Sequence, residues 1–421
     1  MIVELISVGT EILMGNIVNT NAAYLAEQCV ELGLCCYYQS VVGDNADRLS
    51  ETLQTALNRS DIVIMSGGLG PTQDDLTKEV AAKVCGAELY MHEASRDAIK
   101  SYFTKIGKQP TDNNWKQAMM PQGAIILPND NGTAPGCIIE KDGKAVILLP
   151  GPPNELIPMF ENSVVPYVKS KLPSIICSKT VKICGIGESR AEDMISDLIA
   201  KQDNPTIATY AKTGEVHIRV SAKAEDEKTA KNLIKPVVKE LKQRFGNYIY
   251  TTQEDMSLEK VVVDLLIGND MNIATVESCT GGMLAARLIN VPGVSDTFKS
   301  GFVTYSNKAK RKCVGVKKKT LEKYGAVSKQ TAEEMVRGMR TVNKADVVVA
   351  TTGIAGPDGG TPQKPVGLVY IACLVGDKVT VKEYHFAGNR MKVRENAVTS
   401  ALNLVRECIL EYYSEKTFGK K

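Results

Sequence analysis

Short apolar runs alternate with helix-like segments over the first 170 residues of the chain. The runs Ile2–Val8 and Asp61–Met65 are typical of strands, and polar loops separate them from segments in which apolar residues recur at helical spacing, such as Leu76–Cys85. Strands that alternate with helices predict a parallel sheet. Residues 1–170 are therefore expected to form a first α/β domain.

The pattern changes between residues 171 and 252. A strand is predicted at Lys179–Cys184, a hairpin at Thr206–Ser221, and helices at Glu188–Ile199 and Glu225–Phe245. These elements predict a small α+β domain. It could resemble an RNA-binding KH arrangement, but no GXXG loop with basic flanks occurs in it, so a connecting or dimerising role is favoured.

Residues 253–415 return to the α/β pattern, and a Gly/Pro-rich loop at Gly353–Pro365 interrupts it. The elements predicted here are the helix Ser257–Gly268, the strands Ile273–Ala274, Phe302–Tyr305 and Asp346–Thr352, the paired strands Gly367–Leu374 and Lys378–Phe386, and the terminal helix Val393–Glu411. A second, C-terminal α/β domain is therefore expected.

Composition narrows the class of protein. The 421 residues carry a formal net charge of only +3, which argues against a nucleic-acid-binding arm and against a membrane-surface protein. No apolar run approaches the ~20 residues of a membrane span, and the start of the chain has a strand pattern, not that of a signal peptide. The eleven cysteines are scattered without metal-binding spacing, so we expect reduced thiols and a cytoplasmic protein.

The octapeptide Thr275–Gly282 combines a strand end, a glycine turn and a helix start. Backbone N–H groups at a helix start are unpaired and favour anions. Two interpretations stay open from these residues alone. Ser278 or Thr280 could cap the helix, or Ser278 could be a nucleophile beside donors that steady an oxyanion.

A second candidate site lies in the first domain. The loop Ser66–Thr72 offers free N–H groups and glycines that let a phosphate approach closely, and Asp74 and Asp75 follow it. The two carboxylates could hold a divalent cation that bridges phosphates, or they could simply suit the helix dipole. The loop matches neither Walker A nor the Rossmann fingerprint. The candidate nucleotide-binding residues are Thr10, Glu11, Asn19, Gly67, Gly68, Gly70 and Thr72, of which Asn19 could instead cap a helix.

These motifs resemble the start of CinA proteins, the competence/damage-inducible family. The match rests on Gly9-Thr10-Glu11-Ile12 together with the run from Ser66 to Asp75. The resemblance implies a three-layer α/β, molybdopterin-binding-like domain with ADP-ribose pyrophosphatase activity. It also implies a divalent metal ion (Mg, Mn or Co) near Asp74 and Asp75, and it makes a true molybdenum-cofactor role the lesser interpretation.

The last part of the chain is similar to the family's nicotinamide-mononucleotide amidohydrolase domain. The match rests on Glu277–Gly282, on Thr304-Tyr305-Ser306-Asn307 with Lys310, and on Thr352–Pro357. This resemblance implies deamidation of nicotinamide mononucleotide without a metal or other cofactor. Lys308 stands where relatives commonly have an acidic residue, and Val276 stands where they commonly have alanine.

Amide hydrolysis needs a nucleophile, a base and an oxyanion site. Ser278 is the expected nucleophile. No histidine is placed to assist it, so a Ser–Lys arrangement with Lys310 is the natural alternative, provided that burial keeps the lysine neutral. Tyr305 could relay the proton between them. Without the family resemblance, Lys310 would be interpreted as a solvated lysine in a basic helix.

The substrate of this domain also needs a phosphate site. The backbone of the Gly353–Gly360 loop could supply it, and Arg390 and Arg394 could add charge or could simply lie exposed at the start of a helix. The candidate substrate-binding residues are Thr280, Gly281, Gly282, Gly353, Ala355, Gly356, Arg390 and Arg394.

The sequence therefore predicts an α/β protein of three domains, at residues 1–170, 171–252 and 253–415. The expected function is that of a dimeric, bifunctional pyridine-nucleotide hydrolase acting on nicotinamide mononucleotide and ADP-ribose. The alternative is a non-catalytic nucleotide- or molybdopterin-binding protein associated with competence or recombination.

Overall fold

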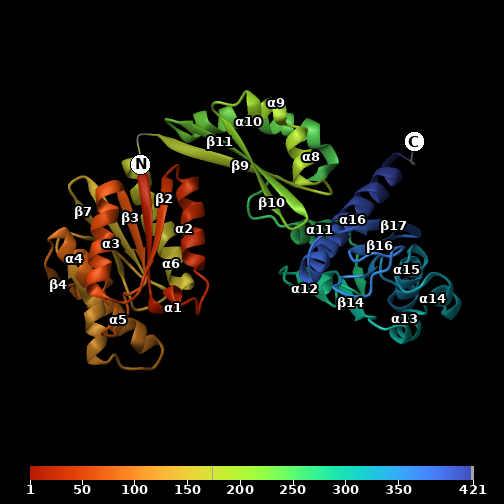
Figure 1. Ribbon diagram of the computed structural model, residues 1–421, viewed down its shortest axis with the longest axis horizontal. Coiled ribbons are helices and arrows are strands. Elements are labelled where there is room, and N and C mark those ends of the chain that lie inside the picture. The colour runs from red at the N-terminus through yellow and green to blue at the C-terminus, as the bar shows by residue number, and fades with distance from the viewer. Residues whose placement is uncertain (173, 419–421) are drawn as a thin grey trace. The chain divides into compact units, whose positions relative to one another are not determined.

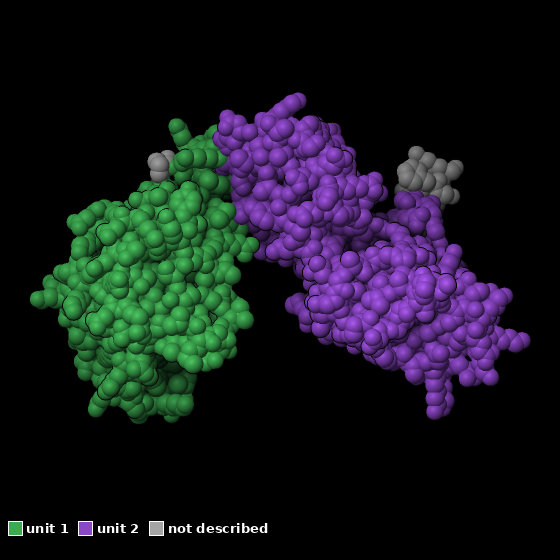
Figure 2. All heavy atoms as spheres, viewed as in Figure 1, with its two compact units in different colours: residues 1–177, 223–231 green, residues 178–222, 232–421 purple. Residues whose placement is uncertain are grey.

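A computed structural model describes residues 1–172 and 174–418 of the chain (Figure 1). The chain divides into two compact units (Figure 2). The first unit comprises residues 1–177 and 223–231, and the second comprises residues 178–222 and 232–421. The first unit thus lies close to the expected first domain, whereas most of the middle segment shares a unit with the C-terminal part.

The first unit is built on a six-stranded sheet in the order β2-β1-β3-β8-β7-β6. Strands β2, β1, β3 and β8 are mutually parallel, and β7 and β6 continue the sheet with antiparallel pairing. The strands are β1 (Ile2–Val8), β2 (Cys35–Val42), β3 (Ile62–Ser66), β6 (Ile125–Leu127), β7 (Gly136–Lys141) and β8 (Lys144–Leu149). The parallel part confirms the expected α/β class.

Helices cover both faces of this sheet and make three layers (Figure 1). Leu25 of α2 (Thr20–Glu31) and Leu156 of α6 (Pro153–Met159) are buried in the core on one face. Leu53 of α3 (Ala46–Arg59) and Val80 of α4 (Thr77–Cys85) are buried on the other face. The remaining elements are α1 (Thr10–Leu13), β4 (Leu89–Met91), α5 (Glu93–Lys105), η1 (Asp112–Ala118), β5 (Met119–Pro121), η2 (Phe160–Val164) and α7 (Val165–Lys171).

The middle segment forms a four-stranded sheet in the order β10-β11-β9-β12 with helices. Its elements are β9 (Ile175–Cys184), α8 (Glu188–Asp193), α9 (Ser196–Ala200), β10 (Thr206–Lys212), β11 (Glu215–Ala224), α10 (Glu227–Phe245), η3 (Gly246–Tyr248) and β12 (Ile249–Thr251). The prediction of a single helix at Glu188–Ile199 is wrong, because the helix is interrupted at Ile195. That residue is fully buried and leaves helical geometry, with a φ of −127°.

The C-terminal part has a five-stranded sheet in the order β14-β13-β15-β16-β17, with β13 parallel to both of its neighbours. Its strands are β13 (Ile273–Glu277), β14 (Phe298–Val303), β15 (Val347–Gly353), β16 (Leu368–Val375) and β17 (Lys378–His385). Because β13, β14 and β15 run the same way, the chain leaves all three at one edge of the sheet, next to Ser278.

Two helix layers cover this second sheet and bury one core on each face. The helices are α11 (Leu258–Gly268), α12 (Met283–Ile289), η4 (Val294–Asp296), α13 (Asn307–Val314), α14 (Lys318–Tyr324), α15 (Lys329–Asn343) and α16 (Arg390–Phe418). Strand β14 begins and ends earlier than expected. It is an edge strand whose exposed and half-buried residues alternate, so its sequence has no continuous apolar run. None of the described helices has both the length and the apolar character needed to span a membrane.

Helix α15 packs so closely on α13 that one position requires glycine. A Cβ atom on Gly338 would lie 1.7 Å from the carbonyl oxygen of Val314, whereas a Cβ on Gly268 would meet nothing within 4 Å. We expect Gly338→Ala to lower the free energy of unfolding of the C-terminal part by about 2 kcal/mol or more, since backbone would have to move. Gly268→Ala should leave that free energy unchanged or raise it by up to about 1 kcal/mol.

Urea unfolding followed by circular dichroism measures both variants. Equal free energies of unfolding for the two variants would show that α13 and α15 pack less closely at Gly338 than the 1.7 Å distance indicates.

Candidate functional site

The turn that presents Ser278 is held by the carboxylate of Glu277. This carboxylate is buried and accepts hydrogen bonds from the N–H groups of Gly282 (2.9 Å), Leu284 (3.1 Å) and Ala285 (2.9 Å) at the start of α12. Glu277 is therefore the cap of this helix, and neither Ser278 nor Thr280 caps it. The hydroxyl of Thr280 instead lies 2.7 Å from that of Thr351, on the neighbouring strand.

The tight turn also depends on two glycines. Gly281 and Gly282 have φ values of 60° and 95°, in the left-handed region that side chains with a Cβ rarely adopt. The N–H of Ser278 donates to the carbonyl oxygen of Thr351 at 3.0 Å, which fixes the start of the turn against β15. The serine hydroxyl is thus left for other partners.

Lys310 makes a direct hydrogen bond to Ser278. Its Nζ lies 2.9 Å from Ser278 Oγ and 2.8 Å from the carbonyl oxygen of Thr304, and the residue is only 1% exposed. Its helix, α13, is capped by the side chain of Ser306. Lys308, Arg311 and Lys312 of the same helix are exposed, so Lys310 differs from its solvated neighbours.

Burial lowers the pKa of Lys310 to about 8. No carboxylate within the described residues forms an ion pair with Lys310, so no ionic partner offsets the cost of burying its charge. An amine with this pKa is partly neutral near physiological pH and can then accept a proton from a hydroxyl. Burial raises the pKa of the adjacent Cys279 thiol to about 11, so this thiol remains protonated and is no rival nucleophile.

Tyr305 and Arg390 form the rim of this site. The Tyr305 side chain is 60% exposed, and its hydroxyl accepts a hydrogen bond from Arg390 Nη2 at 2.9 Å. Because Lys310 contacts Ser278 directly, the relay expected through Tyr305 is not needed for the proton. Arg390 Nη1 donates to the carbonyl oxygen of Gly356 at 2.8 Å, so this arginine joins two of the loops around the site.

Arg394 has a structural task that its sequence position does not suggest. Its Nε and Nη2 donate to the carbonyl oxygens of Cys279 (3.1 Å) and Thr280 (2.9 Å), within the Ser278 turn. Its guanidinium group therefore steadies the turn. The alternative of an ordinary exposed position at the start of α16 does not hold for Arg394.

Unpaired backbone donors lie in the loops of the site. The N–H groups of Cys279 and Thr280, directly after Ser278, donate to no oxygen acceptor among the described residues and contact only the Cys279 thiol, and the N–H groups of Ala355 and Gly356 have no acceptor among the same residues. At the start of α12, by contrast, Glu277 already occupies the donors. Any oxyanion or phosphate site would therefore use these loop N–H groups, and the helix terminus is not free for it.

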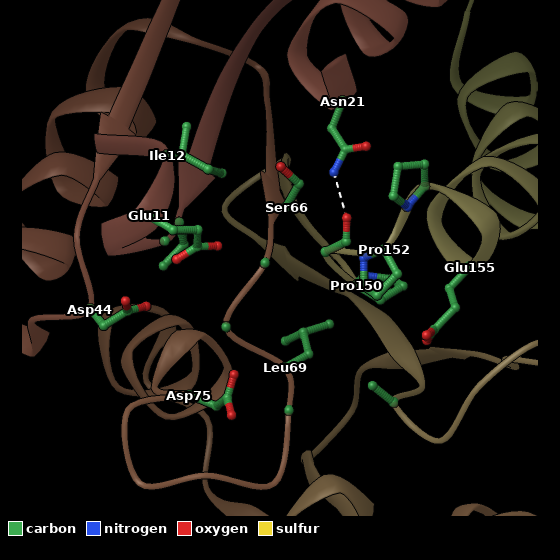
Figure 3. Close-up of a pocket in the computed structure, with 18 of the residues that line it drawn as sticks. Glu11, Ile12, Asn21, Asp44, Ser66, Leu69, Asp75, Pro150, Pro152 and Glu155 are labelled. Atoms are coloured by element: carbon green, nitrogen blue, oxygen red, sulfur yellow. Dashed lines mark hydrogen bonds between the residues drawn. The ribbon is translucent and has the colours of Figure 1, made fainter. Parts of the chain in front are cut away.

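In the first unit, a pocket of about 670 Å³ lies beyond the carboxyl ends of the parallel strands (Figure 3). It is lined by the glycine-rich loop after β3, the loop after β1, and the run Pro150–Pro153 after β8. The expected residues that line it are Glu11, Asn19, Gly67, Gly68, Gly70, Thr72, Asp74 and Asp75. Thr10 does not line the pocket but donates to Asp44, which does.

Two aspartates of the pocket are held in the same way. Asp44 Oδ2 accepts from the N–H (2.9 Å) and hydroxyl (2.8 Å) of Thr10, and Asp75 Oδ2 accepts from the N–H (2.9 Å) and hydroxyl (2.6 Å) of Thr72. In each, Oδ1 has no hydrogen-bond partner among the described residues. Asp74 is exposed and, within the same residues, makes no side-chain hydrogen bond.

Asn19 has the capping role that the sequence left open. Its Oδ1 accepts from the N–H of Ala22 at 3.1 Å at the start of α2, and its Nδ2 donates to Ser7 Oγ at 2.9 Å. Asn21 donates from Nδ2 to the carbonyl oxygen of Gly151 at 2.7 Å and so joins two walls of the pocket (Figure 3).

The residues of the pocket suit a divalent cation only if the ligand shares in binding it. Among the described residues, no group of three or more His, Cys, Asp or Glu side chains could enclose a metal ion. Asp44, Asp74 and Asp75 nevertheless offer uncommitted carboxylate oxygens, which hard cations prefer. The donor set therefore fits a cation that takes its other ligands from phosphate and water.

Among the residues of this pocket that were not expected from the sequence are Asp44, Glu155 and Gln117. Asp44 and Glu155 could have been found, because both follow parallel strands at the edge where ligands bind. Burial raises the pKa of Glu155, and a hydrogen bond from Asn129 opposes the rise. Gln117 comes from η1, far along the chain, and nothing in the sequence marks it.

The lowered pKa of Lys310 predicts how the free energy of unfolding depends on pH. In the folded protein this pKa is about 8, below the ordinary 10.5. Charged Lys310 therefore destabilises the folded state fully below pH 8, and this destabilisation disappears as the pH rises to 10.5, where the lysine is neutral in both the folded and the unfolded state. Relative to Lys310→Met, the wild type should therefore gain about 2–3 kcal/mol in free energy of unfolding between pH 7.5 and 10. Urea unfolding of both proteins at the two pH values measures this change, and parallel pH dependences would contradict it.

Comparisons with known proteins divide the chain into three segments. Family models match residues 4–170 ("Probable molybdopterin binding domain"), 178–251 ("Damage-inducible protein CinA KH domain") and 255–409 ("CinA C-terminal domain"). The match of the middle segment supports the KH-type arrangement, which the sequence left open as one alternative.

The chain is similar to curated proteins over nearly its full length. A Clostridium novyi protein named "Putative competence-damage inducible protein" is 52% identical over 96% of this chain and 97% of its own. The "CinA-like protein" of Kosmotoga olearia is 49% identical over 97% of this chain and 98% of its own. The crystal structure of competence/damage inducible protein CihA from Agrobacterium tumefaciens is 39% identical, covers 36% of this chain and 92% of its own, and has a TM-score of 0.35. The expected resemblance is thereby confirmed, and the chain belongs to the CinA family of competence/damage-inducible proteins.

Proposed function

We propose that the C-terminal part of the protein deamidates nicotinamide mononucleotide to nicotinate mononucleotide and ammonia. The observation that supports this most directly is the 2.9 Å contact between Lys310 Nζ and Ser278 Oγ, made by a lysine that is 1% exposed and whose pKa is lowered to about 8. A serine beside a partly neutral amine is the pairing that acyl transfer requires where no histidine is available.

In this proposal, neutral Lys310 takes the proton of Ser278 as Oγ attacks the carboxamide carbon of the substrate. The N–H groups of Cys279 and Thr280 receive the oxyanion that forms. The C–N bond then breaks, and the leaving nitrogen takes the proton from Lys310 and departs as ammonia. Water, deprotonated by Lys310, attacks the acyl-serine ester, which releases nicotinate mononucleotide and restores the Ser278 hydroxyl.

The phosphate of the substrate would bind the loop after β15. The unpaired N–H groups of Ala355 and Gly356 suit phosphate oxygens, and Arg390, whose guanidinium group contacts Gly356, supplies positive charge at the rim. No metal enters this mechanism.

Ser278→Ala should reduce ammonia release from nicotinamide mononucleotide by about a thousandfold or more, because it removes the nucleophile. Cleavage of ADP-ribose should be unchanged. Ser295→Ala, at an exposed position of η4, is the matched control and should retain full ammonia release. A coupled ammonia assay measures all three proteins. If the wild type releases no ammonia, the amidase proposal fails and the non-catalytic alternative gains.

The same mechanism fixes the pH dependence of deamidation. Lys310 must be neutral to accept the proton, so kcat/KM should rise about tenfold per pH unit below pH 8 and level off above it. Steady-state rates from pH 6 to 9.5 test this shape. A flat profile across pH 7 to 8.5 would remove Lys310 from the role of base.

We further propose that the first unit cleaves ADP-ribose to AMP and ribose 5-phosphate. The support is a 670 Å³ pocket with a glycine-rich loop and uncommitted carboxylates, at the edge of a parallel sheet where nucleotides commonly bind. The N–H groups of Gly68 and Gly70, which donate to no acceptor among the described residues, would bind the diphosphate. Asp74, Asp75 and Asp44 would hold a divalent cation (Mg, Mn or Co), which would neutralise charge on the diphosphate.

Asp74→Ala should lower AMP formation by about a hundredfold, because the side chain is free to act on a cation. Chelation should abolish AMP formation in the wild type. The exposed Asp97 of α5 gives the control variant Asp97→Ala, which should keep its rate. Chromatography of the nucleotide products provides the measurement. Cleavage at full rate in the presence of chelator would remove the metal from the proposal, and absence of AMP under all conditions would remove the activity.

A further inference from the structure

The pocket of the first unit has a charge opposite to that expected for a phosphate site. Its lining includes five carboxylates, from Glu11, Asp44, Asp74, Asp75 and Glu155. No lysine, arginine or histidine among the described residues lines it. Phosphate sites usually contain such cations, because a diphosphate carries formal negative charge of its own.

Two lysines that contact residues of the pocket donate to the protein's own carbonyl oxygens. Lys116 Nζ donates to the carbonyl oxygens of Thr72 (2.9 Å) and Asp75 (2.6 Å) and lies 3.4 Å from Glu79. Lys78 is buried and donates to the carbonyl oxygen of Gln117 at 2.6 Å. Lys116 thus steadies the loop that ends in Asp74 and Asp75, Lys78 holds the end of η1, and neither lysine lines the pocket.

Most of these carboxylates keep at least one oxygen without a hydrogen-bond partner among the described residues. Asp44 and Asp75 each accept two hydrogen bonds at Oδ2 and leave Oδ1 uncommitted, and Asp74 and Glu11 make no side-chain hydrogen bond among the described residues. Figure 3 shows Glu11, Asp44 and Asp75 on one side of the glycine-rich loop and Glu155 on the other. The partial charges of the loop N–H groups are small beside this set of formal charges.

An independent feature also points to a ligand in the pocket. Gln117 lines it and is only 2% exposed. Its Nε2 donates to the carbonyl oxygen of Leu69 at 3.4 Å, which orients the amide, but its Oε1 is buried without any hydrogen-bond donor. A buried acceptor without a partner is costly, and a hydroxyl or amino group of a nucleotide would supply the missing donor.

Resting on the proposed function of this unit, we propose that the pocket binds a nucleoside diphosphate only as its complex with a divalent cation. The carboxylates of Glu11, Asp44, Asp74 and Asp75 repel the bare diphosphate and attract the cation complex. The cation is therefore required for binding of the nucleotide and not only for its hydrolysis. The carboxylates thereby select the cation-bound form of the ligand.

This selection has a consequence that an ordinary metal site lacks. Removing carboxylate charge should improve binding of the nucleotide without the cation, although it weakens binding with the cation. Glu11 and Asp74 are the positions at which to remove it, since Glu11→Gln and Asp74→Asn break no side-chain hydrogen bond made by the described residues. Asp97→Asn removes an exposed carboxylate of α5 away from the pocket lining and is the matched control.

The experiment is titration calorimetry on the full chain with α,β-methylene ADP-ribose, in which a methylene group replaces the cleavable bridging oxygen. For the wild type and for Asp97→Asn, affinity in Mg²⁺ should exceed affinity in chelator by about 30-fold or more. For the double variant Glu11→Gln/Asp74→Asn this ratio should fall below about fivefold. Its affinity in chelator should also exceed that of the wild type. Thermal melting of the double variant shows whether it is folded.

The outcomes separate this inference from the proposed function. Equal affinity of the wild type with and without Mg²⁺ would overturn the inference and leave the diphosphate substrate in place. A folded double variant that binds the cation-free ligand no better than the wild type would also overturn it. Absence of binding in the wild type under both conditions would overturn the substrate assignment, and the inference with it.

Discussion

The C-terminal part of the structure depends on the burial of one amine. Lys310 is 1% exposed and forms no ion pair with a described residue, yet it is held by hydrogen bonds to Ser278 Oγ and the carbonyl oxygen of Thr304. A buried lysine without a counter-ion destabilises the folded state while it is charged, and the surrounding core must offset that cost. The two apolar cores on either side of β13 and β15 provide the necessary rigidity, since they fix the strand end that carries Ser278 and the helix that carries Lys310.

The two candidate sites lie at the same kind of sheet edge but carry side chains of opposite charge. Each lies where parallel strands end, because the loops there converge at one edge of the sheet. In the C-terminal part, an amine is buried without an ion-pair partner among the described residues, and burial lowers its pKa to about 8. In the first unit, carboxylates without a cationic side chain beside them among the described residues line an open pocket. Burial therefore lowers the pKa of a lysine in one site, whereas the other site gathers carboxylates in a pocket open to water.

The sequence predicted the elements, and which candidate residues share a domain, better than it predicted their contacts. Apolar runs such as Ile273–Ala274 indicate buried strands, and the order of motifs brought Ser278 and Lys310 into one domain. The role of Glu277 as helix cap could not be predicted, because the carboxylate reaches across a turn whose shape depends on Gly281 and Gly282. Arg394 was expected at the site, but its contacts with the Ser278 turn could not be predicted, since its partners are backbone carbonyls more than 100 residues away in the sequence.

The helix that begins at the Ser278 turn is fixed at its other end by the middle segment. Arg287, in the last turn of α12, donates to Glu259 of α11 (2.9 Å), Thr399 of α16 (2.8 Å) and Glu215 of β11 (3.1 Å). The hydroxyl of Tyr250 also donates to Glu215. A seven-residue helix has little stability of its own, so its position depends on these contacts and on the Glu277 cap. The middle segment and the Ser278 turn thus both contact one short helix. This common element gives a physical reason why the two parts form a single compact unit.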